Sequence, residues 1–71
     1  MDVRVINPTA YLYEVQVYIT KSCDDTTMMY EWYTVKTVCG SYKAAIRYAT
    51  ELSEIGSQNP TIDELKELNI I

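Results

Sequence analysis

Three aromatic residues carry the most distinctive chemistry in this 71-residue sequence, namely Tyr18, Tyr30 and Trp32. Tyrosine is the compositional anomaly, because the chain holds seven Tyr and one Trp but no Phe. Tyrosine and tryptophan combine an apolar ring with a polar group, which suits half-exposed positions and binding surfaces. We therefore expect these residues to act in recognition, through stacking and apolar contact.

Catalytic chemistry is disfavoured by the residue types that the sequence lacks. With no histidine, the commonest acid/base residue and metal ligand is absent, and the serines and cysteines have no histidine to activate them. The two glycines cannot form a phosphate-binding loop, and Cys23 and Cys39 do not form a CxxC motif. We expect a protein that is not an enzyme and that uses no cofactor and no metal ion.

A second set of candidate binding residues is acidic. The net charge is −4, and residues 1–49 hold five acidic and five basic side chains, so the whole excess follows Ala49. An acidic surface repels phosphate groups and favours a partner with a basic surface. The candidate partner-binding acids are Glu54, Asp63, Glu64 and Glu67. The alternative is that these acids only keep a small protein soluble.

A β-hairpin is predicted to position the aromatic residues. Residues 11–20 alternate between two sets of side chains with a period of two, and they are rich in residues that favour strands. A second strand-like run covers residues 28–39, and the polar segment 21–27 between the runs predicts an antiparallel turn. Residues 2–6 are expected to add a third strand, which returns through a turn at residues 7–10.

The register of the hairpin follows from its side-chain pairs. If the numbers of paired residues sum to 50, Tyr18 lies opposite Trp32 and Glu14 lies opposite Lys36. A shift by one residue loses the charge pair and scatters the aliphatic matches, which are worth about 0.2–1 kcal/mol each. The favoured register places Tyr18, Tyr30 and Trp32 on one face of the sheet. Glu14 and Lys36 are expected at the rim of that face.

Two helices are predicted after the hairpin. Ser41 is a good N-cap for a helix that begins at Tyr42 and stops near Gly56. Thr61 and Glu64 form a capping box for a short second helix over residues 62–68. The apolar stripe of the first helix consists of Tyr42, Ala45, Ile46, Tyr48, Ala49, Leu52 and Ile55. The fold class is therefore α+β, with a two- or three-stranded antiparallel sheet, one packed helix and a short C-terminal helix in a single domain spanning 1–71.

One helix cannot cover both faces of a hairpin, which leaves three fates for the aromatic residues. Their face is exposed as a partner site, covered by the C-terminal helix, or buried in a homodimer. Bases of single-stranded nucleic acid could also stack there, but basic side chains that would hold the phosphates are sparse. Binding of a protein partner is therefore favoured over direct nucleic-acid binding. A nucleic-acid-binding accessory domain is the alternative.

Two family resemblances bear on function. Residues 35–38, Ser41 and the alanine-rich segment 42–49 resemble the last strand and helix of double-stranded RNA-binding domains, but only Lys43 stands where those domains carry a lysine cluster. In size, acidity and tyrosine-rich hairpin-plus-helix layout, the whole chain resembles small bacteriophage accessory proteins, among them anti-CRISPR and anti-restriction proteins. The latter resemblance implies an inhibitor that occludes a host defence protein or a nucleic-acid-binding protein.

The expected location follows from segments that the sequence does not contain. No apolar run approaches the roughly 18 residues of a membrane span. The start Met1-Asp2-Val3-Arg4 does not read as a signal peptide, since no basic segment precedes an apolar stretch. We expect a cytoplasmic protein without a membrane partner, located in the host cell cytoplasm if a phage encodes it.

Overall fold

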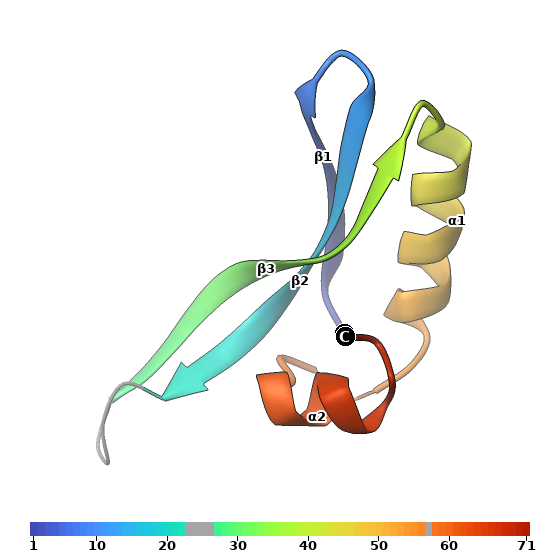
Figure 1. The fold of residues 1–71 in the computed structure, drawn as a ribbon. Helices are drawn as coiled ribbons and strands as arrows, with labels where there is room; N and C mark the ends of the chain where they lie inside the picture. The colour runs from blue at the N-terminus through green and yellow to red at the C-terminus, as the bar shows by residue number, and fades with distance from the viewer. Residues whose placement is uncertain (23–26, 57) are drawn as a thin grey trace.

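The computed structural model describes residues 1–22, 27–56 and 58–71. Its elements follow the order β1 (Val3–Thr9), β2 (Leu12–Ser22), β3 (Met28–Cys39), α1 (Tyr42–Ser53) and α2 (Ile62–Glu67). The strands form one antiparallel sheet in the order β1-β2-β3, so β2 is central (Figure 1). The predicted α+β class, with one longer helix and a short C-terminal helix, is confirmed.

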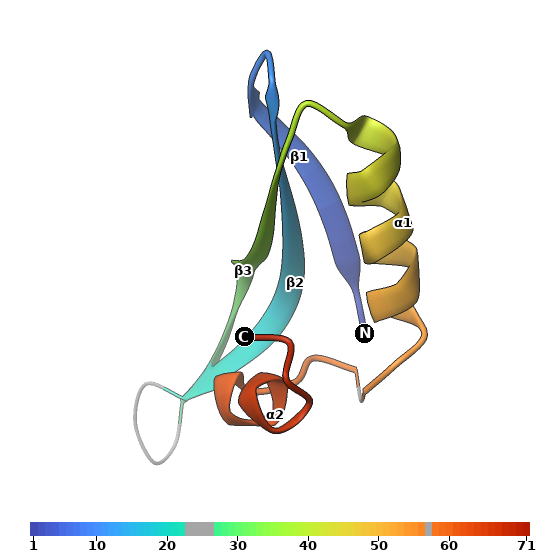
Figure 2. The ribbon, with the colours of Figure 1, turned by 45° about the vertical axis from the view of Figure 1, so that its right-hand side comes forward.

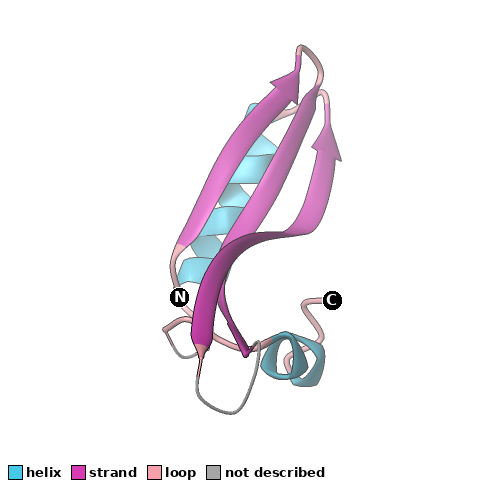
Figure 3. Ribbon diagram, turned by 90° about the vertical axis from the view of Figure 1, so that its left-hand side faces the viewer, coloured by secondary structure: helices cyan, strands magenta, loops and turns pink. Residues whose placement is uncertain are grey.

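The two helices lie on the same side of the sheet. α1 runs along one face of the strands, and α2 closes the lower end of that side (Figure 2). The core consists of odd-numbered residues of β2 and residues of both helices: Val15, Val17, Ile19, Ala45, Leu52 and Leu65. Side chains alternate along a strand, so the even-numbered residues of β2 point to the opposite face. Neither helix covers that opposite face (Figure 3).

The predicted register of β2 against β3 is right only in the half of the hairpin that contains Tyr18 and Trp32. Tyr18 pairs with Trp32 as expected, but Glu14 pairs with Thr37 and not with Lys36. A β-bulge between these pairs inserts one extra residue into β3 and shifts every later pair by one. The prediction of one continuous register was therefore wrong.

The bulge also moves Lys36 to the other face of the sheet. Its Nζ lies 5.8 Å from the centre of the Tyr48 ring on α1, on the helix side. Val35 and Val38, on either side of it, both pack against the core. A bulge lets two residues of one strand oppose one of its partner, which reverses the alternation beyond that point. Lys36 is therefore absent from the rim of the face that carries Tyr18 and Trp32, where the predicted register had placed it.

β1 extends further than the sequence predicted. The strand continues through Asn7 and Pro8 to Thr9, and the turn is made by Ala10 and Tyr11. Proline is tolerated here because β1 is an edge strand and needs no N–H at that position. The side chain of Asn7 donates to the carbonyl groups that flank the turn. The predicted turn at residues 7–10 was thus placed too early.

α1 begins and ends where its caps predict. The Ser41 hydroxyl accepts a hydrogen bond from the N–H of Ala44 at 3.1 Å, and Gly56 follows the helix with a positive φ of 74°. The predicted apolar stripe was too wide. Ala45 and Leu52 are buried, but three of its members are largely exposed, namely Tyr42 (56%), Ile46 (38%) and Ile55 (44%).

The connection to α2 joins the sheet through backbone hydrogen bonds. The Thr20 N–H donates to the carbonyl of Pro60 at 3.0 Å, and the Thr20 hydroxyl donates to the carbonyl of Asn59 at 2.8 Å. The Thr61 hydroxyl then accepts from the N–H of Glu64 at 3.2 Å, which confirms the predicted N-cap. The segment before α2 is therefore hydrogen-bonded to the same edge of β2 that pairs with β1, beyond Val17, where that pairing begins.

Candidate functional site

The hairpin brings the three predicted aromatic residues together on its uncovered face. Trp32 lies directly across from Tyr18, and Tyr30 lies across from Thr20. The Tyr18 and Trp32 ring centres are 5.0 Å apart with planes tilted by 46°. Tyr18 also stacks on Tyr30, at 5.8 Å and 18°. These spacings are those of favourable aromatic pairs, so the rings form one connected group.

Arg4 extends this group from β1. The pairing of Arg4 with Gln16 places it on the same face, and its guanidinium carbon lies 4.3 Å from the centre of the Trp32 ring. That distance is typical of a cation–π contact. We call Arg4, Gln16, Tyr18, Tyr30 and Trp32 together the aromatic face. The sequence reasoning missed Arg4 because no register was derived for β1; alternation from a β1–β2 pairing would have found it.

Gln16 is the polar centre of the aromatic face. Only 9% of it is exposed, and its side-chain oxygen accepts from Arg4 Nε at 2.7 Å. Its amide nitrogen donates to the Thr34 hydroxyl at 3.0 Å, and that hydroxyl donates to a Glu14 carboxylate oxygen at 3.0 Å. A buried amide needs such partners to offset the loss of water. The network thus fixes Arg4 and the floor of the aromatic face in one geometry.

The aromatic face remains open to solvent in the described chain. Tyr30 is 49% exposed and the neighbouring Met28 is 60% exposed, whereas Tyr18 and Trp32 are half-buried by each other and by Arg4. α2 does not cover it, because Leu65 of α2 belongs to the core on the helix side. One of the three predicted fates, coverage by the C-terminal helix, is therefore wrong.

The acidic candidates lie on other elements. Glu54 is the C-cap of α1, Asp63 and Glu64 form the first turn of α2, and Glu67 is its last residue. Asp63 and Glu64 stand where the positive end of the helix dipole favours negative charge. Glu54, Asp63 and Glu67 are exposed, and Glu64 is half-buried. The acids therefore lie on elements separate from those that carry the aromatic face.

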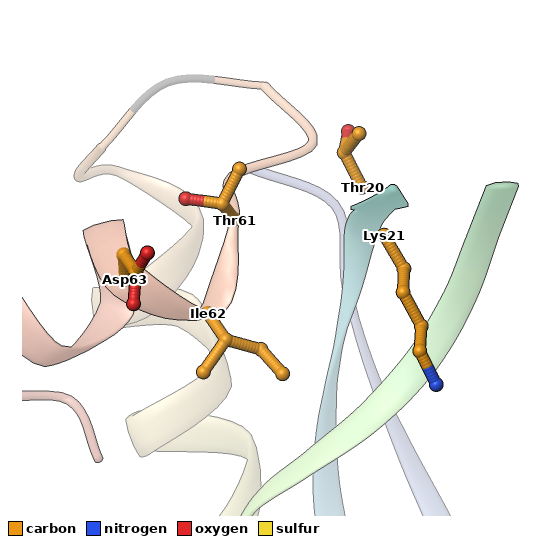
Figure 4. A pocket seen from close by; sticks show the side chains of 5 residues that line it. All are labelled: Thr20, Lys21, Thr61, Ile62 and Asp63. Carbon is orange, nitrogen blue, oxygen red and sulfur yellow. The ribbon is translucent and has the colours of Figure 1, made fainter. Parts of the chain in front are cut away.

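A shallow hollow of about 250 Å³ lies between the end of β2 and the start of α2 (Figure 4). Its lining consists of Thr20, Lys21, Thr61, Ile62 and Asp63. In Figure 4 the Lys21 side chain extends towards β3 and away from Asp63, and its Nζ lies 3.6 Å from a Glu31 oxygen. The hollow is open, and its acid and base do not face each other. It offers no arrangement for acid/base catalysis.

Within the described ranges, no group of three or more His, Cys, Asp or Glu side chains could hold a metal ion. In the same part of the chain, no helix is both long and apolar enough to cross a membrane. Comparisons with protein-family models, with curated proteins and with solved structures found no match to this chain.

Proposed function

We propose that this chain is a non-enzymatic protein-binding protein that contacts its partner through the aromatic face. The observation that carries the proposal is the open stack of Tyr30, Tyr18, Trp32 and Arg4 on a sheet face that neither helix covers. Tyrosine, tryptophan and arginine are the residues most enriched in binding hot spots. Gln16 holds the arrangement in place before a partner arrives, which reduces the entropy lost on binding.

The charge distribution supports a partner with a basic surface. The chain carries −4, and the acids of α2 add a negative region beside the open hairpin. The aromatic face itself contributes one cation, Arg4, which is engaged with Trp32 and Gln16. Opposite charges steer association and exclude wrong partners. A basic nucleic-acid-binding protein fits this description, and its occlusion by this chain is the specific form of the proposal: an inhibitor of a host defence protein.

A second candidate function is a nucleic-acid-binding accessory domain. The stacked Tyr18 and Tyr30 rings, with Arg4 over Trp32, present flat groups on which unpaired bases could stack. The excess of acid opposes this function, because phosphate contacts supply most nucleic-acid affinity. The β-bulge is a second argument against nucleic-acid binding, because it removes Lys36 from the aromatic face.

The proposal is tested by an inhibition assay with matched tyrosine and tryptophan variants. Bacteria with a defined CRISPR–Cas or restriction system would express the full chain and be challenged with a targeted phage. We expect the wild-type chain to raise the plaque count, and Trp32→Ala to lose that effect while remaining folded. The control is Tyr11→Ala, which removes an 80% exposed ring far from the aromatic face and should inhibit like the wild type.

A fluorescence titration separates the two functions. Trp32 is the only tryptophan, so its emission reports on the aromatic face. Under the main proposal, a single-stranded DNA oligonucleotide at low salt leaves the emission unchanged. Saturable quenching by the oligonucleotide, together with wild-type inhibition by Trp32→Ala, would replace protein binding by the alternative.

A further inference from the structure

The free edge of β3 presents backbone groups that take no part in the side-chain contact proposed above. Among the residues that the structure describes, β3 has a single neighbour in the sheet, because the strand order is β1-β2-β3. From Met28 to Thr34 its pairing with β2 is regular, and the bulge interrupts the pattern only beyond that stretch. An edge strand presents a row of N–H and C=O groups that can pair with another extended chain. In Figure 1 this half of β3 projects below α1, and its outer edge is open.

The hydrogen bonds of β2 show which residues of β3 face outwards. The Tyr18 N–H donates away from β3, to a carbonyl that precedes β1, at 3.0 Å. Backbone groups alternate in direction along an antiparallel strand, so those of Ile19 point towards β3 and its partner Glu31. The N–H and C=O of Tyr30 and Trp32, on either side of Glu31, therefore point to the free edge.

The side chains along this edge differ between the two faces. Tyr30 and Trp32 lie on the aromatic face, whereas Glu31 points to the opposite face, with 46% of its side chain exposed. Its ion pair with Lys21, at 3.6 Å, is equally open to water and contributes little to stability. Glu31 is the one charged residue from Met28 to Thr34. A strand added at this edge would meet rings on one face and a carboxylate on the other.

The geometry points to a specific occupant: an extended segment of the partner protein that carries a basic side chain between two apolar ones. This inference rests on the proposed function and specifies how the partner binds. The backbone of the segment pairs with the outward groups of Tyr30 and Trp32. Its apolar side chains extend the aromatic face, and its basic side chain lies beside Glu31 on the other face. The chain's net charge of −4 favours the same basic segment at longer range.

A second copy of this chain fits the edge less well. Any antiparallel pairing of two β3 strands that uses the outward groups of Tyr30 and Trp32 sets the two Glu31 side chains opposite or diagonal to each other on one face. Like charges at such positions destabilise strand pairing. Each copy also carries −4, so association brings together two molecules of the same sign. The basic segment has neither disadvantage.

The direct test is a titration of the full chain with synthetic peptides. The probe is a capped seven-residue peptide with valine and lysine at alternating positions, and the control has glutamate in place of each lysine. Amide hydrogen exchange, followed residue by residue by NMR, reads out edge pairing. We expect the lysine peptide to protect the Tyr30 and Trp32 amides, while the amide of Glu31, directed towards β2, changes little. The glutamate peptide should bind at least about tenfold more weakly, since a tenfold change in affinity corresponds to about 1.4 kcal/mol and like charges across an interface cost more than that.

A pair of substitutions at Tyr30 separates backbone pairing from ring contact. Tyr30→Ala removes the ring but keeps the N–H, whereas Tyr30→Pro removes both and breaks no bond to β2. We expect Tyr30→Pro to bind the lysine peptide about five- to tenfold more weakly than Tyr30→Ala, as the loss of about 1 kcal/mol of hydrogen bonding implies. Glu31→Pro is the folding control, because it removes an N–H that points to β2 and should lower the melting temperature.

Three results would overturn the inference: no binding of the lysine peptide, equal binding of the glutamate peptide, or binding that leaves the Tyr30 and Trp32 amides unprotected. These results are distinct from a failure of the proposed function. If edge pairing fails but Trp32→Ala still abolishes inhibition, the aromatic face remains the partner site. If Trp32→Ala inhibits like the wild type, the proposed function itself is wrong.

Discussion

The two faces of the sheet alternate along the same strand, yet they meet water in opposite ways. On the helix side, Val15, Val17 and Ile19 are fully buried beneath α1 and α2. On the other side, Gln16 and Tyr18 are covered, among the described residues, by neighbouring side chains of the sheet and by neither helix. Aliphatic side chains gain stability only when another layer removes them from water. Rings with polar groups and an amide with hydrogen-bond partners can instead form a stable surface that stays open.

This difference separates the structural role of the helix-side face from the binding role proposed for the aromatic face. The aliphatic face holds the fold together, whereas the aromatic face is organised without being needed to exclude water from a core. Its contacts are ring to ring, guanidinium to ring, and side chain to side chain. A surface of this kind can exchange solvent for a partner without unfolding the protein. Substitutions on the two faces should therefore separate stability from binding.

The largest expected effect is on the helix side, at Ile19. Ile19→Ala removes a fully buried side chain that packs in one cluster with Leu65, and it should lower the free energy of unfolding by about 2–5 kcal/mol. A domain of this size buries little surface in total, so much of the population should be unfolded. Urea denaturation followed by circular dichroism measures the loss. A wild-type midpoint would contradict the assignment of this face as the core.

A smaller loss of stability is expected on the aromatic face. Trp32→Ala removes the ring contacts to Tyr18 and Arg4 but leaves the helix-side core complete. Ring pairs are worth about 0.5–1.5 kcal/mol and exposed cation–π contacts about 0.5–1 kcal/mol, which together predict a loss of about 1–2.5 kcal/mol. The same urea experiment checks it. A loss as large as that of Ile19→Ala would mean that Trp32 is part of a second core.

A comparable loss is expected when the cap of α2 is removed. Thr61→Ala deletes the hydroxyl that accepts from Glu64 N–H and should cost about 1 kcal/mol. Leu65 lies one turn further on, so weaker capping should also loosen the cover of the sheet at that end. Thr61→Ser keeps the hydroxyl and serves as the control. Equal melting of the alanine and serine variants would show that the hydrogen bond contributes nothing.

The class of the fold and the identity of the aromatic residues could both be predicted from the sequence. Alternation of residue types is strong along β2, and the Ser41 and Thr61 caps define where the helices begin. The half of the hairpin near Tyr18 and Trp32 is regular, so simple pairing placed the two rings correctly. Local patterns are enough where the backbone geometry is ideal.

Other features depend on contacts that a local pattern does not contain. The extra residue at the bulge changes no residue type, so nothing in the sequence marked the turn of Lys36 towards Tyr48. Ile46 is exposed although it belongs to the apolar stripe, because a helical stripe does not define which of its members the sheet covers. The role of Arg4 required the register of β1, and the position of α2 required the contacts of Leu65 with the core.

The smallest expected change in stability comes from the acidic region, where the effect on binding separates solubility from recognition. Asp63→Asn with Glu67→Gln removes two exposed charges of α2. Asp63 interacts with the helix N-terminus, worth about 0.3–1 kcal/mol, so the melting temperature should fall only slightly. If the acids steer a basic partner, this variant should associate more slowly, and the wild-type rate should fall with salt because exposed charges are screened over about 10 Å at 0.1 M.

The matched control is Asp2→Asn with Glu51→Gln, which changes the net charge equally at exposed positions outside α2. Inhibition and association are then compared at low and physiological salt. A larger loss in the α2 variant than in the control assigns recognition to α2, whereas equal losses mean that only the total charge matters. Unchanged inhibition in both leaves the acids as solubilising groups, and the partner contact is then confined to the aromatic face and the edge of β3.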